Sequence, residues 1–212
     1  EIEDSNRHRQ RIARIWDMCS LFLQGKQHLR WDRNLSNYVG VPQERGRARV
    51  TINMILNVYR NIQARLSVAY PSMTVLPASP STEDIQRSEA AETLLRYYWH
   101  TNEMKDVITE ALEWLLLTGN AAFHTFYDPK TERVTTTAVS PYDVHFESGA
   151  TSPAESEWVA LSHIITRKAL KESYPDHAEA IEKSSASPSN LHQTLYQRAS
   201  GTEGVELKEP VY

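Results

Sequence analysis

Residues 104–119 read MKDVITEALEWLLLTG, and the fold of the chain is decided by this stretch and by the strands that follow it. Apolar residues recur in the stretch at the three- and four-residue spacing of a helix with one buried side. Gly119 then supplies a residue that adopts a left-handed conformation at little steric cost, which is how many helices end. The stretch therefore predicts an amphipathic helix that ends at Gly119.

Three β-rich runs follow this helix. They are AAFHTFYD at 121–128, RVTTTAV at 133–139 and YDVHF at 142–146, separated by the turn residues of 128–131 and by Ser140-Pro141. We expect them to form an antiparallel meander with one polar side exposed. The predicted fold class is α+β, with helices packed around this small meander.

Cap and turn residues predict the other elements. We expect helices over 3–24, 52–68, 82–100 and 167–173, with Ser81 and Thr166 at the starts of the last two. We expect further strands over 73–76, 158–165 and from 208 onward.

The segments between these elements suggest three divisions of the chain. Residues 1–49 are predicted to be an N-terminal helix and a connecting arm, in which 26–49 lack any periodicity. Residues 50–183 form the α+β core, and 184–212 begin with a mobile segment rich in Ser, Gly and Pro. The chain reads as a piece of a longer polypeptide.

Composition excludes some classes of protein. The 212 residues are 40% hydrophobic and 24% charged, which is ordinary for a globular protein. No apolar run reaches the length that spans a bilayer, so we expect no membrane partner. A single cysteine, Cys19, excludes an internal disulfide, and its helix-like surroundings predict a packed thiol.

Charge is distributed unevenly along the chain. Residues 1–82 carry 12 basic and 6 acidic groups, a net +6, whereas residues 83–212 carry 11 and 21, a net −10. Residues 45–82 hold five arginines and no acid. Such a stretch suits a nucleic-acid contact, a solvated face or pairing with the acids of a neighbour. The candidate DNA or subunit interface consists of Arg45, Arg47 and Arg49, with Trp31 and Tyr38 as aromatic anchors.

Residues suited to catalysis are nearly absent. The sequence has no glycine-rich phosphate loop, no G-x-S-x-G motif and no Cys/His spacing typical of zinc. His124, Asp143 and His145 lie on predicted neighbouring strands, where a solvated sheet face explains them as well as a catalytic or metal site does. Asp106, Glu110 and Glu113 fit the polar side of the 104–118 helix. We therefore expect no catalytic, cofactor-binding or metal-binding residue, and no enzyme.

The order of these motifs resembles the portal proteins of tailed bacteriophages. The resemblance covers residues 47–176, with one departure at FESGATSP (146–153). It is carried by four runs in order: RVTINMILNVYRNIQARLSVAYPSMTVLPAS at 49–79, LLLTGNAAFHTFYD at 115–128, VSPYDVHFE at 139–147 and ESEWVALSHIITRKALKESYPD at 155–176.

This resemblance implies a wing-like region of a larger portal fold, whose stem and clip would follow residue 212. It implies a structural subunit of a dodecameric ring at the capsid vertex, which forms the channel for DNA packaging and ejection. The implied partners are the terminase motor, the major capsid and scaffolding proteins, tail or adaptor proteins, and double-stranded DNA. Assembly would take place in the host cytoplasm. The alternative is a nucleic-acid-binding accessory domain or an enzyme that uses the arginine-rich 45–82 stretch.

Overall fold

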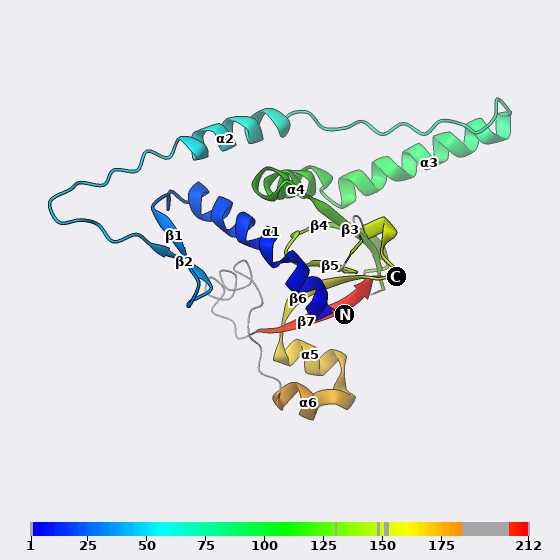
Figure 1. Cartoon of the computed structure of the whole chain (residues 1–212). Coiled ribbons are helices and arrows are strands. Elements are labelled where there is room, and N and C mark those ends of the chain that lie inside the picture. The colour runs from blue at the N-terminus through cyan, green and yellow to red at the C-terminus, as the bar shows by residue number, and fades with distance from the viewer. Residues whose placement is uncertain (1, 130, 148, 151–152, 184–203, 212) are drawn as a thin grey trace. The chain divides into compact units, whose positions relative to one another are not determined.

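The computed structural model of the chain describes residues 2–129, 131–147, 149–150, 153–183 and 204–211 (Figure 1). The chain divides into two compact units: unit 1 is Glu1–Asp17 with Pro141–Tyr212, and unit 2 is Met18–Ser140. Helix α1 (Ile2–Leu23) therefore begins in unit 1 and ends in unit 2. The assignment of 1–49, 50–183 and 184–212 to an arm, a core and a mobile segment stays a prediction, and most of the last lies outside the described residues.

Unit 2 holds helices and two small sheets. Its elements after α1 are β1 (Leu29–Asp32), β2 (Asn37–Gly40), α2 (Met54–Leu66), α3 (Thr82–Thr101), α4 (Met104–Thr118), β3 (Ala122–Asp128) and β4 (Arg133–Val139). Helix α4 contacts α2, α3 and β4. The predicted helix end is confirmed, because Gly119 has a φ of 79° and donates its N–H to the carbonyl of Leu115 at 2.9 Å.

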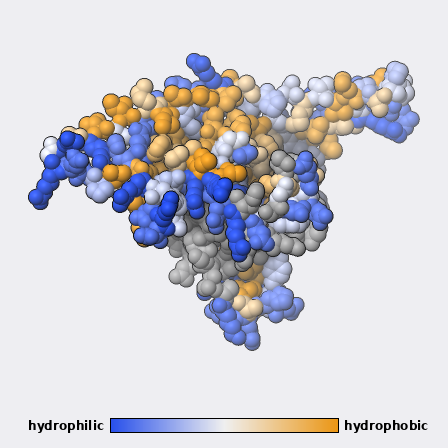
Figure 2. All heavy atoms as spheres, viewed as in Figure 1, coloured by the Kyte–Doolittle hydropathy of each residue, from blue (hydrophilic) through white to orange (hydrophobic). Residues whose placement is uncertain are grey.

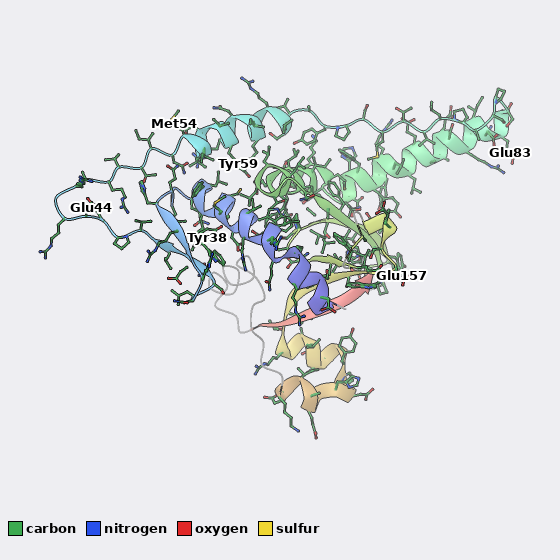
Figure 3. All side chains as sticks on the ribbon, viewed as in Figure 1. Tyr38, Glu44, Met54, Tyr59, Glu83 and Glu157 are labelled. Carbon is green, nitrogen blue, oxygen red and sulfur yellow. The ribbon has the colours of Figure 1, made fainter. Side chains whose placement is uncertain are left out.

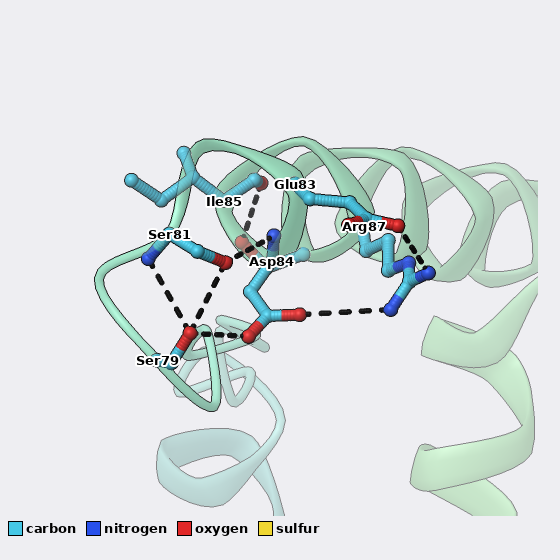
Figure 4. Close-up of polar contacts among 7 residues, drawn as sticks. Ser79, Ser81, Glu83, Asp84, Ile85 and Arg87 are labelled. Carbon is cyan, nitrogen blue, oxygen red and sulfur yellow. Dashed lines mark hydrogen bonds and ion pairs between the residues drawn. The ribbon is translucent and has the colours of Figure 1, made fainter.

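The start of α3 follows the predicted cap chemistry (Figure 4). The hydroxyl oxygen of Ser81 accepts the N–H of Asp84 at 3.2 Å, which satisfies one of the free donors of the first turn. The carboxylate of Asp84 accepts the Ser79 hydroxyl at 2.5 Å and lies 3.6 Å from Arg87, which also pairs with Glu83. Acidic side chains at the N-terminus interact favourably with the positive end of the helix dipole. The predicted helix start at Ser81 is confirmed by its capping hydrogen bond.

The predicted three-stranded meander is wrong in its pairing. Strands β3 and β4 form a two-stranded antiparallel sheet, whereas β5 (Val144–Phe146) pairs with β6 (Val159–Thr166) in a separate sheet. Pro141 has no N–H to continue a ladder from β4. The carbonyls of Pro141 and Tyr142 are moreover taken by the side chain of Arg9. The α+β class itself is confirmed, as helices with small antiparallel sheets.

Two further predictions in unit 2 are corrected. Residues 73–76 form no strand, because no described strand pairs with them and a single extended segment has no ladder to join. The connector 26–49 contains the β1–β2 hairpin. Its turn is fixed by Asp32, whose carboxylate accepts the N–H groups of Asn34 and Leu35 at 2.9 and 3.3 Å.

Unit 1 builds a three-stranded sheet in the order β5-β6-β7. Its elements after α1 are β5, η1 (Pro153–Glu155), β6, α5 (Arg167–Ser173), η2 (Pro175–His177), α6 (Ala178–Lys183) and β7 (Gly204–Val211). The predicted cap of α5 is confirmed, since the Thr166 hydroxyl accepts the N–H of Ala169 at 3.3 Å. Leu170 and Ile181 are buried together, with Ile165 packed against them, and this cluster joins α5, α6 and the sheet.

Candidate subunit and nucleic-acid interface

The two predicted aromatic anchors lie opposite each other in the β1–β2 hairpin. Trp31 and Tyr38 are register partners, and their rings meet edge to face with centroids 5.0 Å apart. Both side chains are half-buried. An isolated hairpin is only marginally stable in water. The contact between these two rings therefore stabilises the β1–β2 hairpin itself. Contact of either ring with a neighbour stays a prediction.

The three candidate arginines have different surroundings. Arg47 pairs with Glu44 at 2.9 Å on the surface, where such a pair contributes little stability. Arg49 donates to the carbonyls of Val41 and Pro42 at 2.6 and 3.1 Å and so closes the loop after the hairpin. Arg45 is exposed and forms no ion pair with any described residue. The three arginines thus differ in their partners within the chain, and their contact with DNA or a neighbouring subunit stays a prediction.

Unit 2 buries little apolar surface. Among the described residues six apolar side chains are buried, and only Ala111 of these belongs to unit 2. Figure 2 shows hydrophobic atoms, in orange, where Figure 1 places α2. The large exposed apolar side chains of α2 and of the segments next to it are Val50, Ile52, Met54, Ile55, Val58, Ile62, Leu66 and Val68. Exposed apolar residues grouped in this way are typical of interaction sites.

A polar cluster in unit 1 is centred on Arg9 of α1. Its guanidinium donates to the carbonyls of Pro141 at 3.1 Å and Tyr142 at 2.9 Å, and also to that of Val144. Nη2 of Arg9 lies 3.3 Å from Nδ1 of His145. One side chain of α1 thus satisfies the backbone of the turn that leads into β5.

The proton of His145 is placed by its partners. The ring is 1% exposed. Because Arg9 can only donate, Nδ1 of His145 accepts and the proton resides on Nε2. Nε2 lies 3.1 Å from the Ser162 hydroxyl, which is 3.4 Å from a carboxylate oxygen of Asp143. This chain of polar contacts joins α1, β5 and β6 and is structural.

Tyr142 adds a second link to α1. Its ring meets Trp16 edge to face at 5.0 Å, and its hydroxyl donates to the carboxylate of Asp17 at 3.0 Å. Burial raises the pKa of Asp17 above its ordinary value, and the hydrogen bond from Tyr142 opposes that rise. Sequence reasoning missed Arg9, Asp17 and Tyr142, because they are joined across more than a hundred residues.

His124 does not share a unit with Asp143 and His145, although the sequence places all three on predicted neighbouring strands. His124 belongs to unit 2, where its ring stacks on Phe126 at 4.9 Å, whereas the other two residues belong to unit 1. In the part of the chain that the structure describes, no three side chains are grouped to hold a metal ion. None of the helices formed by the described residues is both long and apolar enough to cross a membrane.

Comparison with protein families decides among the predicted classes. The family model of the phage P22-like portal protein matches residues 23–209. The chain belongs to this family. A search of curated proteins found no match. The predicted resemblance to phage portals is thus confirmed, and it extends beyond the 47–176 range. The portal chain has a structural role in the phage, as a capsid component of the virion, and its family is not a known enzyme family.

Proposed function

We propose that the portal chain is a subunit of a dodecameric ring at one capsid vertex, which forms the channel for DNA packaging and ejection. In this proposal the ring binds the terminase motor, the major capsid and scaffolding proteins, and later the tail or adaptor proteins. The observation that carries the proposal is the family match over residues 23–209.

The apolar surface of unit 2 supports this proposal. A unit that buries Ala111 alone among its described apolar side chains, and leaves α2 exposed, gains stability when other subunits cover it. The uneven charge along the chain also suits contacts between unlike surfaces, which close into rings. We further propose that residues 26–49, with the Trp31–Tyr38 pair, reach onto an adjacent subunit.

The test is the mass and the activity of the purified full-length protein. We expect closed rings of twelve subunits by mass photometry and negative-stain microscopy, and no hydrolysis of ATP or DNA without the motor. A strictly monomeric particle at micromolar concentration would contradict the proposal, as would hydrolysis by the isolated protein. Either result would favour the alternative of a nucleic-acid-binding accessory domain or an enzyme that uses residues 45–82.

A further inference from the structure

Helix α2 carries an apolar stripe on its exposed side. The stripe consists of Met54, Ile55, Val58, Ile62 and Leu66, which together span about a third of the helix circumference at 3.6 residues per turn. Their exposed fractions run from 40% at Leu66 to 62% at Met54. The stripe is therefore continuous and open to solvent along the whole helix.

The other side of α2 already has a partner within unit 2. Figure 3 shows Tyr59 on the side of α2 toward α4, and burial, followed by the charge of Glu113 on α4, raises the pKa of Tyr59. Gln63 donates to the Glu113 carboxylate at 2.8 Å, and Leu56 is half-buried on the same side. The apolar face of α2 is therefore wider than the part that α4 contacts, while Asn57, Arg60 and Asn61 form the polar side of the helix. The apolar stripe is the part still to be covered.

The charge on α2 indicates what covers the stripe. The helix carries Arg60 and Arg65 and no acid, so its net charge is +2. Neither arginine forms an ion pair with a described residue. Arg65 lies at the edge of the apolar stripe by helical spacing. A surface that receives this helix should therefore be apolar and flanked by acids.

Helix α3 presents such a surface. Ala90, Leu94 and Tyr97 follow the i, i+4, i+7 spacing of one helix side, and the exposed fractions of Leu94 and Tyr97 are 54% and 53%. The helix holds four acids and two arginines, a net charge of 2 − 4 = −2. Glu89 beside this side is exposed and forms no ion pair in the described part of the chain. We call Ala90, Leu94 and Tyr97 the α3 flank.

We propose that the apolar stripe of α2 packs against the α3 flank of the neighbouring copy around the ring. The inference rests on the proposed function and deepens it by naming the contact surfaces. Because the two surfaces differ, each copy offers one to the neighbour on either side, and such contacts close into a ring. Opposite charge on α2 and α3 orients the two helices and disfavours contact between two α2 helices.

The first test compares two double variants of α2 in the full-length protein. V58D/I62D places two carboxylates in the apolar stripe, and the control N57D/A64D places them on other exposed positions of the same helix. We expect normal rings from the control and at least a tenfold smaller ring fraction from V58D/I62D, with circular dichroism unchanged. If V58D/I62D formed normal rings, the proposed contact between the apolar stripe and the α3 flank would be wrong.

The second test remains informative if V58D/I62D does not fold. Two single variants, I62C and L94C, are made in a C19S background and mixed during assembly. We expect disulfide-linked dimers from the mixture under mild oxidation, and none from I62C alone or from N57C mixed with L94C. Rings without the I62C–L94C link would overturn the inference alone, whereas wild-type protein that forms no ring would overturn the proposed function with it.

Discussion

Nη2 of Arg9 and Nδ1 of His145 lie 3.3 Å apart although 136 residues separate them in the sequence. The same guanidinium also binds three carbonyls of the turn before and within β5. Hydrogen bonds from a charged group are worth more than neutral ones, and buried carbonyls left unpaired are costly. Replacement of Arg9 by Ala should therefore lower the free energy of unfolding by about 2–3 kcal/mol.

Chemical denaturation of the R9A variant measures this loss. The matched control is R11A, because Arg11 lies on the same helix, is exposed and has no ion pair with a described residue. R9K should lie between the wild type and R9A, since one ammonium group cannot reproduce the planar fork of a guanidinium. Equal stability of R9A and R11A would show that the Arg9 cluster does not hold unit 1 together.

The buried carboxyl of Asp17 should make stability depend on pH. Burial raises its pKa above the ordinary 3.8, so the folded chain holds this proton to a higher pH than the unfolded chain does. In this pH range the folded state binds more protons than the unfolded state. Asp17 therefore makes the free energy of unfolding fall as pH rises from 3.8 through the raised pKa of the folded state. The asparagine side chain of the D17N variant cannot ionise, but its amide oxygen can still accept the hydrogen bond from the Tyr142 hydroxyl.

We therefore expect D17N to gain stability relative to the wild type as pH rises through this window. Urea denaturation of both proteins at a series of pH values from about 3 to about 7 measures the difference. A difference that does not change with pH would contradict the assignment. The variant Y142F, which removes the hydroxyl and leaves the carboxyl, should show a pKa of Asp17 raised still further.

The stability cost of replacing Gly119 should depend on how readily the new residue adopts a left-handed backbone conformation. A Cβ built on this glycine meets no atom within 4 Å apart from its chain neighbours, so a Cβ has room, but the φ of 79° at this residue is left-handed. G119V should cost about 1–2 kcal/mol because a β-branched residue is strained there. G119N should cost clearly less, because asparagine adopts this conformation more readily. Thermal unfolding compares them, and equal melting temperatures for the two variants would contradict the argument.

Replacement of the three candidate arginines separates DNA contact from subunit contact. If Arg45, Arg47 and Arg49 meet DNA, the triple alanine variant should bind DNA more weakly, and the slope of log affinity against log salt should fall by about 0.9 for each phosphate that these arginines no longer neutralise. If they meet a neighbour, ring assembly should weaken instead. Filter binding at several salt concentrations and mass photometry measure the two effects.

The control for this experiment is K168A/K183A, which removes two exposed basic groups outside the arginine stretch. R49A alone should also loosen the arm, because Arg49 holds the carbonyls of Val41 and Pro42. Normal rings, normal packaging and an unchanged salt slope in the triple variant would exclude both roles.

Helix ends could be predicted from the sequence because their chemistry is local. The capping hydroxyls of Ser81 and Thr166 accept N–H groups of residues only three positions later, Asp84 and Ala169. Both partners of the hydrogen bond can therefore be recognised in one short stretch of sequence. Strand pairing is not local in this sense. The run at 73–76 has the side chains of a strand, but a strand also needs a partner, and nothing within its own residues states whether one exists.

The candidate site shows the same limit. Trp31 and Tyr38 can be chosen as candidate anchors from their residue type, but their mutual packing depends on the turn at Asp32, and the sequence gives no sign of a hairpin there. His145 has the pattern of an exposed strand residue, because the polar partners that bury it, Arg9 and Ser162, come from elsewhere in the chain. The exposed stripe of α2 could not be separated from its covered part by periodicity, because the two lie next to each other on one wide apolar face.

Unit 1 is discontinuous in the chain, and this sets an order of events during synthesis. Unit 2 is one uninterrupted segment, so all of it leaves the ribosome before Pro141 is available to Arg9, 132 residues earlier. Trp16 therefore lacks its contact with the Tyr142 ring until that residue emerges. Transiently exposed apolar surface promotes aggregation, so unit 1 is completed later in synthesis than unit 2 and is exposed to this risk for longer.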